Sequence, residues 1–238
     1  MNHRKQSTYG VRIMDHRSLA LCLSSATLAM TTGVYGFKFV RKRNFLLGFE
    51  WWIVTISASN ALLFFVTESP VSYGISHFLD AFSRGFGMPV IAVAGLMAVT
   101  HGYRPSVRQD LLLFVLAAVG TVALVAAGFL QGVLPYFYVT MWTLLSVYLA
   151  GFVMRLLRAG HAFHALTTTV ALVASQSIAC IYDFYRIPGE DTNVVFNFYV
   201  LALLTWSYFT VVIYYAYSAL ERGKGRSQAG AGVLSYPK

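Results

Sequence analysis

Residues 45–67 read FLLGFEWWIVTISASNALLFFVT, and Glu50 is the single charged side chain in these 23 residues. At about 1.5 Å per residue, a helix of this length crosses the ~30 Å hydrocarbon core of a bilayer. The stretch is continuously apolar, whereas a strand of a membrane barrel alternates polar and apolar residues over about ten positions. It therefore predicts a transmembrane helix.

The whole chain shares this character. Of its 238 residues, 57% are hydrophobic and 11% are charged, and the mean hydropathy is +0.61. A soluble domain usually carries about 25% charged residues, so most of this surface is expected to face lipid. At roughly 30 residues per span and connection, the length allows seven or eight helices and no sizeable soluble domain.

Seven apolar segments are long enough to span a membrane. They are residues 18–39, 45–67, 82–100, 111–130, 136–157, 163–185 and 195–218. The predicted fold class is an all-α polytopic membrane protein, a bundle of about seven transmembrane helices with the N-terminus outside and the C-terminus inside. The predicted divisions are a polar N-terminal tail (1–17), the seven-helix bundle (18–219) and a short basic cytoplasmic tail (220–238).

The orientation is predicted from the basic residues of alternate loops, because cytoplasmic loops collect Lys and Arg. One side has eleven: Lys38, Arg41, Lys42, Arg43, Arg104, Arg108, Arg155, Arg158, Arg222, Lys224 and Arg226. The other side has Arg84 and Arg186, together with acidic residues. The side with eleven is therefore expected to be cytoplasmic.

The N-terminal tail conflicts with this orientation, because it holds Arg4, Lys5, Arg12 and Arg17 on the predicted outer side. Two explanations are open. Translation begins at Met14, which leaves a short tail with Arg17 alone, or the first segment does not fully span. The first explanation is favoured because residues 18–39 are long enough to cross.

The third segment is the least regular. Before it, Val71, Ile75, Phe78 and Phe82 recur at helical spacing, which predicts an amphipathic helix lying on the outer interface. The segment then opens with residues 84–89, RGFGMP, where two glycines and a proline can bend or break a helix. We expect a kink here, with a broken helix lining a cavity as the alternative.

Polar residues inside the spans suggest a route through the bundle, because charged groups in a bilayer are costly and usually face a partner or water. The candidate path for a ligand or ion runs from the predicted cytoplasmic end to the outer end: Glu50, Ser57, Asn60, Gln176, Asp183 and Asn197. The alternative is that each polar group bonds a neighbouring helix as a packing contact.

A second candidate site is an outer vestibule for a cationic or zwitterionic ligand. Its residues belong to the predicted outer side: Glu68, His77, Asp80, Arg84 and Arg186. Asp80 and Arg84 are four residues apart and can pair on one helix. The alternative is that these are solvated loop charges.

Three histidines at the predicted cytoplasmic interface form a third candidate site. His101, His161 and His164 could bind a metal or supply axial ligands to haem. Against this, no carboxylate or cysteine accompanies the pair at positions 161 and 164. Histidines close to Arg155 and Arg158 are also explained as part of the positive interface.

No motif names a reaction, because the chain has no Gly-rich phosphate loop, Gly-x-Ser-x-Gly or His-Glu-x-x-His. A non-enzymatic role is favoured: a multi-pass inner-membrane protein that binds or transports a small solute or ion through a polar path between helices. The alternatives are a membrane redox or metal (haem) protein using the histidines, and an accessory subunit of a membrane complex.

The expected partners are the lipid bilayer and a small solute or ion, with a homo-oligomer or a membrane partner subunit as further candidates. The net charge of +9 does not indicate nucleic acid, because basic cytoplasmic loops meet anionic lipid. The sequence identifies no cofactor.

Overall fold

The computed structural model describes residues 16–184 and 198–233, and the side chains of 16–184 and 198–223. All regular structure in this part of the chain is helical, with no strand. Seven helical runs are long and apolar enough to cross a membrane. The predicted all-helical bundle with seven possible spans is thereby confirmed, and the orientation stays a prediction.

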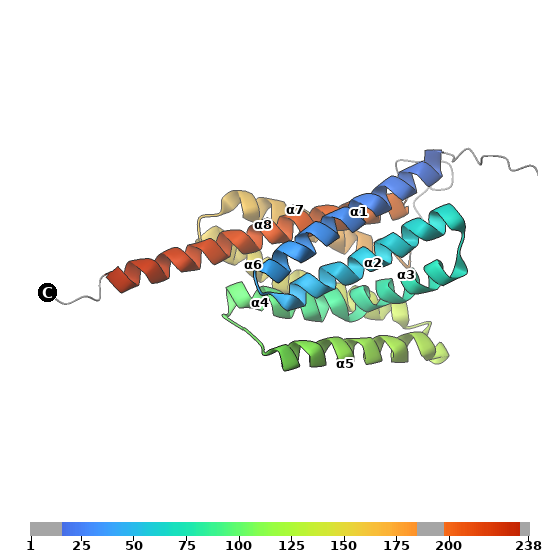
Figure 1. Cartoon of the computed structure of the whole chain (residues 1–238), viewed down its shortest axis with the longest axis horizontal. Coiled ribbons are helices and arrows are strands. Elements are labelled where there is room, and N and C mark those ends of the chain that lie inside the picture. The colour runs from blue at the N-terminus through green and yellow to red at the C-terminus, as the bar shows by residue number, and fades with distance from the viewer. Residues whose placement is uncertain (1–15, 185–197, 234–238) are drawn as a thin grey trace, which may run out of the picture.

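The helical runs as far as α7 follow one another with short connections (Figure 1). They are α1 (His16–Arg41), α2 (Phe45–Thr67), the joined elements α3 (Pro70–Phe82), η1 (Ser83–Ala92) and α4 (Val93–Thr100), α5 (Val107–Ala126), α6 (Leu134–Arg158), α7 (Ala162–Ile181) and α8 (Phe198–Val233). A short 3₁₀ turn, η2 (Gly128–Leu130), lies between α5 and α6. The apolar part of α8 is Phe198–Gly223.

Local capping explains why α2 begins and ends where the sequence predicts. The Asn44 side chain accepts a hydrogen bond from the Leu47 N–H at 3.2 Å, and it donates to the Gly95 carbonyl at 2.8 Å. At the other end, Glu68 has left-handed φ of 55° and Ser69 caps the next helix, whose first residue is Pro70. The turn between α2 and α3 is therefore tight.

The predicted fourth span is displaced by four residues at each end. The helix runs from Val107 to Ala126 rather than over 111–130. Ser106 and Gln109 form a capping box, which starts the helix one turn before the apolar run begins. Apolar periodicity alone missed this boundary because it does not detect a polar first turn.

The amphipathic helix predicted before the third span is present as α3, but it continues that span instead of lying across its end. Pro70–Thr100 forms one continuous helical run of 31 residues, and its α3 portion packs alongside α2. The Ser57 hydroxyl, which donates to the Ser76 carbonyl at 3.1 Å, ties the two helices together. The apolar residues Val71 and Ile75 are exposed, whereas the polar residues Ser76 and Asp80 lie on the face of α3 that is turned toward the interior of the bundle.

The segment with two glycines and Pro89 widens the helix instead of breaking it. Ser83–Ala92 has π-helical winding, with Pro89 inside it. Proline has no N–H and clashes with the carbonyl of an α-helix turn, and a wider turn relieves both problems. Because π-helical runs are rare and occur mostly at functional sites, η1 is a reason to examine its surroundings.

The Pro70–Thr100 run is the most buried of the seven spans. It contacts α2, α5 and α6 along its length, while α1, α8 and α7 close the other side of the bundle through successive contacts. Helix α5 lies at the edge (Figure 1), packed against α3 and η1. The central run therefore positions residues against several neighbouring helices at once.

A pair of glycines sets the close crossing of α1 and α2. A Cβ added at Gly48 would lie 2.5 Å from Val40 Cγ2 and 3.2 Å from the Gly36 carbonyl oxygen. A Cβ at Gly36 would lie 2.6 Å from Trp52 Cδ1. Small residues allow the two helices to approach closely. The resulting van der Waals contact stabilises the pair, because the hydrophobic effect does not drive helices together within lipid.

Replacing Gly48 with alanine is expected to lower the free energy of unfolding by about 1–3 kcal/mol, because the added methyl group overfills the crossing. Unfolding in lipid bicelles, followed by far-UV circular dichroism, measures this. Gly151→Ala in α6 is the matched control, since no atom lies within 4 Å of a Cβ added there. Equal stability of the two variants would contradict the proposed contact.

Candidate functional site

A cavity of about 420 Å³ lies between α2, α3, η1 and α8, with Tyr182 and Asp183 just beyond the end of α7 and single side chains from α1 and α6. Each main helix contributes one face at intervals of three or four residues. On α8, for example, the lining residues are Tyr199, Ala202, Leu203, Trp206 and Thr210. His77 and Tyr73, both exposed, lie on its α3 wall. The cavity is therefore a space enclosed by helices with access at the α3 end.

Arg84 is the central charged group of the cavity wall. It is 8% exposed and forms ion pairs with Asp183, just beyond α7, and with Asp80, at 3.6 Å between Nη1 and Oδ2. Its guanidinium carbon lies 4.1 Å from the ring centre of Tyr138 and 3.9 Å from that of Tyr182. Arg84 thus ties the central helix to α6 and to the end of α7 through charge and cation–π contacts.

Asp80 is the less neutralised carboxylate of this group. Arg84 pairs closely with Asp183, whereas its contact with Asp80 is long. The Tyr182 hydroxyl donates to Asp80 Oδ2 at 3.4 Å. Burial, reinforced by the nearby Asp80 charge, raises the pKa of the Tyr182 phenol well above its usual value, so it remains a donor. With two carboxylates and one guanidinium, the ionised cluster carries one surplus negative charge.

Aromatic rings form much of the remaining wall. Trp51, Trp142 and Trp206 line the cavity, and the rings of Trp142 and Trp206 lie 6.4 Å apart in a stacked arrangement. The indole N–H groups of Trp51 and Trp206 are buried without a hydrogen-bond partner among the described residues. Trp51 is only 1% exposed. Buried polar groups are normally paired, but these two nitrogens are fully buried within the wall, so the tryptophans offer the cavity their ring surfaces and not their N–H groups.

Glu50 lies behind this wall and does not line the cavity. Its side chain is fully buried, and both carboxyl oxygens lack a hydrogen-bond partner among the described residues. Gly87 of η1 packs directly against the carboxyl group, so that a Cβ there would overlap both oxygens. Ser83, one turn earlier in η1, faces the Glu50 carboxyl and also lines the cavity.

The predicted polar path divides into groups that lie apart. Ser57 and Asp183 both line the cavity. Asn60 donates to the Ile56 carbonyl of its own helix at 2.9 Å. Gln176 accepts from Ser146 of α6 at 2.7 Å and donates to Thr143 at 3.3 Å, so it serves as an α6–α7 packing contact. Asn197 lies outside the described residues.

The predicted vestibule is partly assembled. His77, Asp80 and Arg84 line the cavity together. Glu68 is exposed at the end of α2 and does not line it. Arg186 lies outside the described residues. The i,i+4 pairing of Asp80 with Arg84 is present.

The three predicted metal-binding histidines do not converge. His101 Nε2 lies 2.9 Å from Arg155 Nη2, and its Nδ1 lies 2.9 Å from the Thr100 hydroxyl, so both ring nitrogens are engaged. His161 and His164 are neighbours, with ring centres 6.2 Å apart. Within residues 16–184 and 198–223, no group of three or more His, Cys, Asp or Glu side chains could hold a metal ion.

Comparisons with protein families, with characterised proteins and with solved structures gave no match. The arrangement of the cavity is therefore the basis on which a role for the chain is argued. A surplus carboxylate charge and aromatic faces can together hold a small organic cation.

Sequence reasoning found the charged residues of the cavity and missed the tryptophans. Trp51 and Trp206 lie in the middle of apolar segments, away from the headgroup level that tryptophan usually occupies. An indole N–H in the hydrocarbon region needs a partner. The position of these two tryptophans in the sequence could therefore have identified them, and it indicates two of the helices that form the cavity.

Proposed function

We propose that this chain is a multi-pass membrane protein that binds a small organic cation in the cavity between α2, α3, η1 and α8, as a step in its transport or sensing. The observation that carries the proposal is the position of the Asp80–Arg84–Asp183 cluster on the wall of a cavity of about 420 Å³. Such a volume falls in the range of ligand pockets in proteins, about 300–1,000 Å³.

The surplus negative charge of the cluster favours a cation over an anion or a neutral solute. In a cavity bounded by apolar helices, electrostatic attraction is less screened than in water. Rings of Trp51, Trp142 and Trp206 offer π faces, and each desolvated cation–π contact contributes about 0.5–2 kcal/mol.

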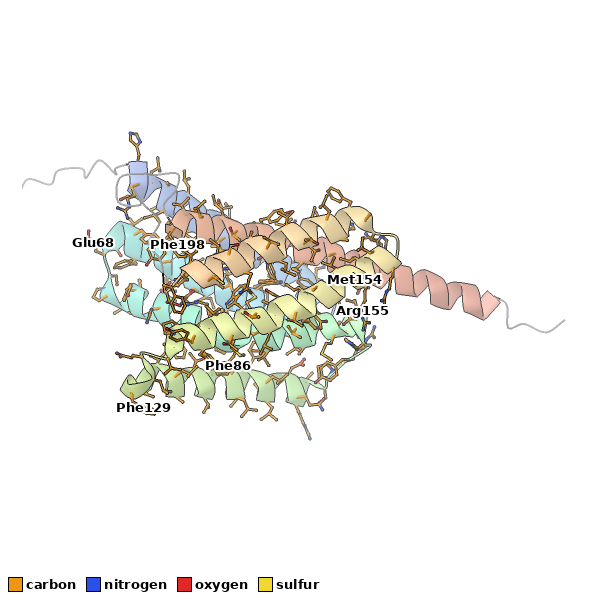
Figure 2. All side chains as sticks on the ribbon, turned by 180° about the vertical axis from the view of Figure 1, so that it is seen from behind. Glu68, Phe86, Phe129, Met154, Arg155 and Phe198 are labelled. Atoms are coloured by element: carbon orange, nitrogen blue, oxygen red, sulfur yellow. The ribbon has the colours of Figure 1, made fainter. Side chains whose placement is uncertain are left out.

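We also propose that the cavity faces the outside and that the chain resides in the inner membrane. The C-terminal ends of α1, α4 and α6 lie together, with Arg41, Arg104 and Arg155 at or just beyond them, and α8 runs past these ends, with Arg222 at the end of its apolar part. Figure 2 shows Arg155 at this end and Glu68 at the opposite end. Basic residues favour the cytoplasmic side, which places the mouth of the cavity near His77 on the outer side.

Choline and its neutral carbon analogue dimethylbutanol differ mainly in charge, so they test the proposal directly. We expect choline to change the tryptophan fluorescence of the purified chain in nanodiscs, because three of the four tryptophans line the cavity. We expect the neutral analogue to bind at least about tenfold more weakly, which corresponds to about 1.4 kcal/mol.

The control is the variant Leu144→Ala, since Leu144 is exposed on α6 and outside the cavity. It should bind choline as the unaltered chain does. Equal affinity for choline and the neutral analogue, or no binding of either, would contradict a cation site.

A further inference from the structure

The Glu50 carboxyl group occupies a closed position beside the cavity. It is fully buried and has no hydrogen-bond partner of ordinary geometry among the described residues. An ionised carboxylate without a partner is very costly in an apolar interior, and such a group takes up a proton instead. This arrangement therefore favours the neutral carboxylic acid form of Glu50.

The packing around Glu50 leaves room for a proton and not for a metal cation. Gly87 lies directly against both carboxyl oxygens, so closely that even one added methyl group would overlap them. A sodium or calcium ion needs several oxygen ligands at more than 2 Å around a space of its own. Among the described residues, the Ser83 hydroxyl is the polar group that accompanies the carboxyl.

Ser83 connects this closed position with the cavity. Its hydroxyl faces the Glu50 carboxyl and is itself buried without a well-aligned partner, while the residue also lines the cavity wall. A hydroxyl group can accept one proton and donate its own. Ser83 therefore lies between the Glu50 carboxyl and the cavity, and because its hydroxyl is itself buried, it reaches cavity water only when the wall shifts.

The charged groups on the surrounding elements leave Glu50 unpaired. α1, α3, η1 and α4 pack against α2, and none of their described charged side chains interacts with the Glu50 carboxyl. Arg17, Lys38 and Arg41 lie toward the ends of α1, whereas His77, Asp80 and Arg84 lie along the cavity. α4 carries no charged residue.

The π-helical element η1 is the part of the wall beside Glu50 whose helical winding can change. Both residues against Glu50, Ser83 and Gly87, belong to η1. Local rewinding between π and α geometry changes the positions of these residues while the helix remains continuous. A small shift of η1 would therefore expose or cover the carboxyl.

We propose that Glu50 is a proton-binding site served by Ser83, and that a cation in the cavity causes release of its proton. In this step the O–H bond of the Glu50 acid breaks, the Ser83 hydroxyl accepts that proton while giving up its own to cavity water, and a carboxylate remains. A nearby positive ligand favours this carboxylate. By linkage, raising the pH then strengthens cation binding. The link to the ligand rests on the proposed function, whereas the proton site does not.

Infrared difference spectroscopy of the full chain in nanodiscs tests the proton site without any ligand. The unaltered chain, titrated between about pH 5 and about pH 10, a range that spans the pKa values known for buried glutamates, should show the carbonyl band of a protonated carboxylic acid that disappears on deprotonation. Glu50→Gln should lack this band. The matched control Asp110→Asn, which alters another buried carboxyl, should retain it.

Ser83→Ala adds a readout of the proposed relay. We expect the acid band to persist in this variant but to shift at least about tenfold more slowly on transfer to heavy water, because the carboxyl has lost its contact with the cavity. Circular dichroism checks the folding of every variant. A band unchanged in Glu50→Gln would overturn the proton site, and exchange as fast as in the unaltered chain would overturn the role of Ser83.

Addition of saturating choline near the midpoint of the titration then tests the coupling. We expect the Glu50 band to weaken on choline binding in the unaltered chain. If choline binds, as judged by tryptophan fluorescence, and the band does not change, the coupling is overturned. If choline does not bind, the proposed function fails, while the ligand-free titration still decides the proton site.

Discussion

Replacing Arg84 with methionine is expected to lower the free energy of unfolding by about 3–5 kcal/mol, the usual cost of removing one partner from a buried ion pair. Asp183 and Asp80 would then share a wall with no cation between them. The rings of Tyr138 and Tyr182 would also lose a cation–π contact on each side of the guanidinium. Unfolding in bicelles followed by circular dichroism measures the loss.

A second substitution distinguishes charge from packing at this position. Asp183→Asn in the Arg84→Met background should recover part of the stability, because it removes one carboxylate that was left unpaired. Arg84→Lys should be intermediate, since it restores the charge without the flat guanidinium that lies between the two tyrosines. If Arg84→Met unfolds as the unaltered chain does, the cluster is not a structural centre.

Asp80→Asn is expected to weaken choline binding by about tenfold to a hundredfold, since hydrogen bonds and contacts to a charged group are worth about 1.5–3 kcal/mol. Asp80 is the carboxylate that Arg84 neutralises least. The substitution keeps the size of the side chain and an oxygen that can accept from the Tyr182 hydroxyl. Titration of tryptophan fluorescence measures the change.

The neutral analogue dimethylbutanol separates this effect from a general disturbance of the cavity. Its binding should be nearly unchanged in Asp80→Asn, because it carries no charge to be recognised. A parallel loss of affinity for both compounds would show that the substitution had altered the shape of the cavity, and would contradict charge recognition by Asp80.

The sequence predicted the spans well where caps and apolar runs agree. Residues 45–67 match α2 at both ends because Asn44 and the Glu68-Ser69-Pro70 turn stop the helix where the apolar run stops. The third span was harder. Its start was obscured by the polar face of α3, which serves the cavity, and the π-helical winding of η1 depends on how neighbouring helices accommodate Pro89.

The residue types of the candidate site could be predicted from the sequence, but the neighbouring helix that each side chain faces could not. Glu50, Asp80 and Arg84 stand out as charges inside or beside apolar segments. Gln176 stands out equally, yet it faces α6. The rotation of each helix about its axis is set by packing against several neighbours, as at Gly36 and Gly48. One sequence does not reveal that rotation, so polar stripes on different helices could not be matched.

The central claim, a solvent-accessible cavity that favours cations, is tested most directly by thiol modification at Ser57. Ser57 lines the cavity on α2, and replacing Cys22 and Cys180, the free cysteines of the described residues, makes Ser57→Cys the reactive position. A trimethylammonium methanethiosulfonate and a sulfonate methanethiosulfonate then compare the two signs of charge at the same atom. Rates are expressed relative to a free thiol in solution.

We expect the cationic reagent to react at least about tenfold faster than the anionic one, and we expect Asp80→Asn to reduce this ratio. Both results follow from the surplus carboxylate charge next to the cavity. Faster reaction of the anionic reagent, equal rates for both, or no modification by either would contradict the account.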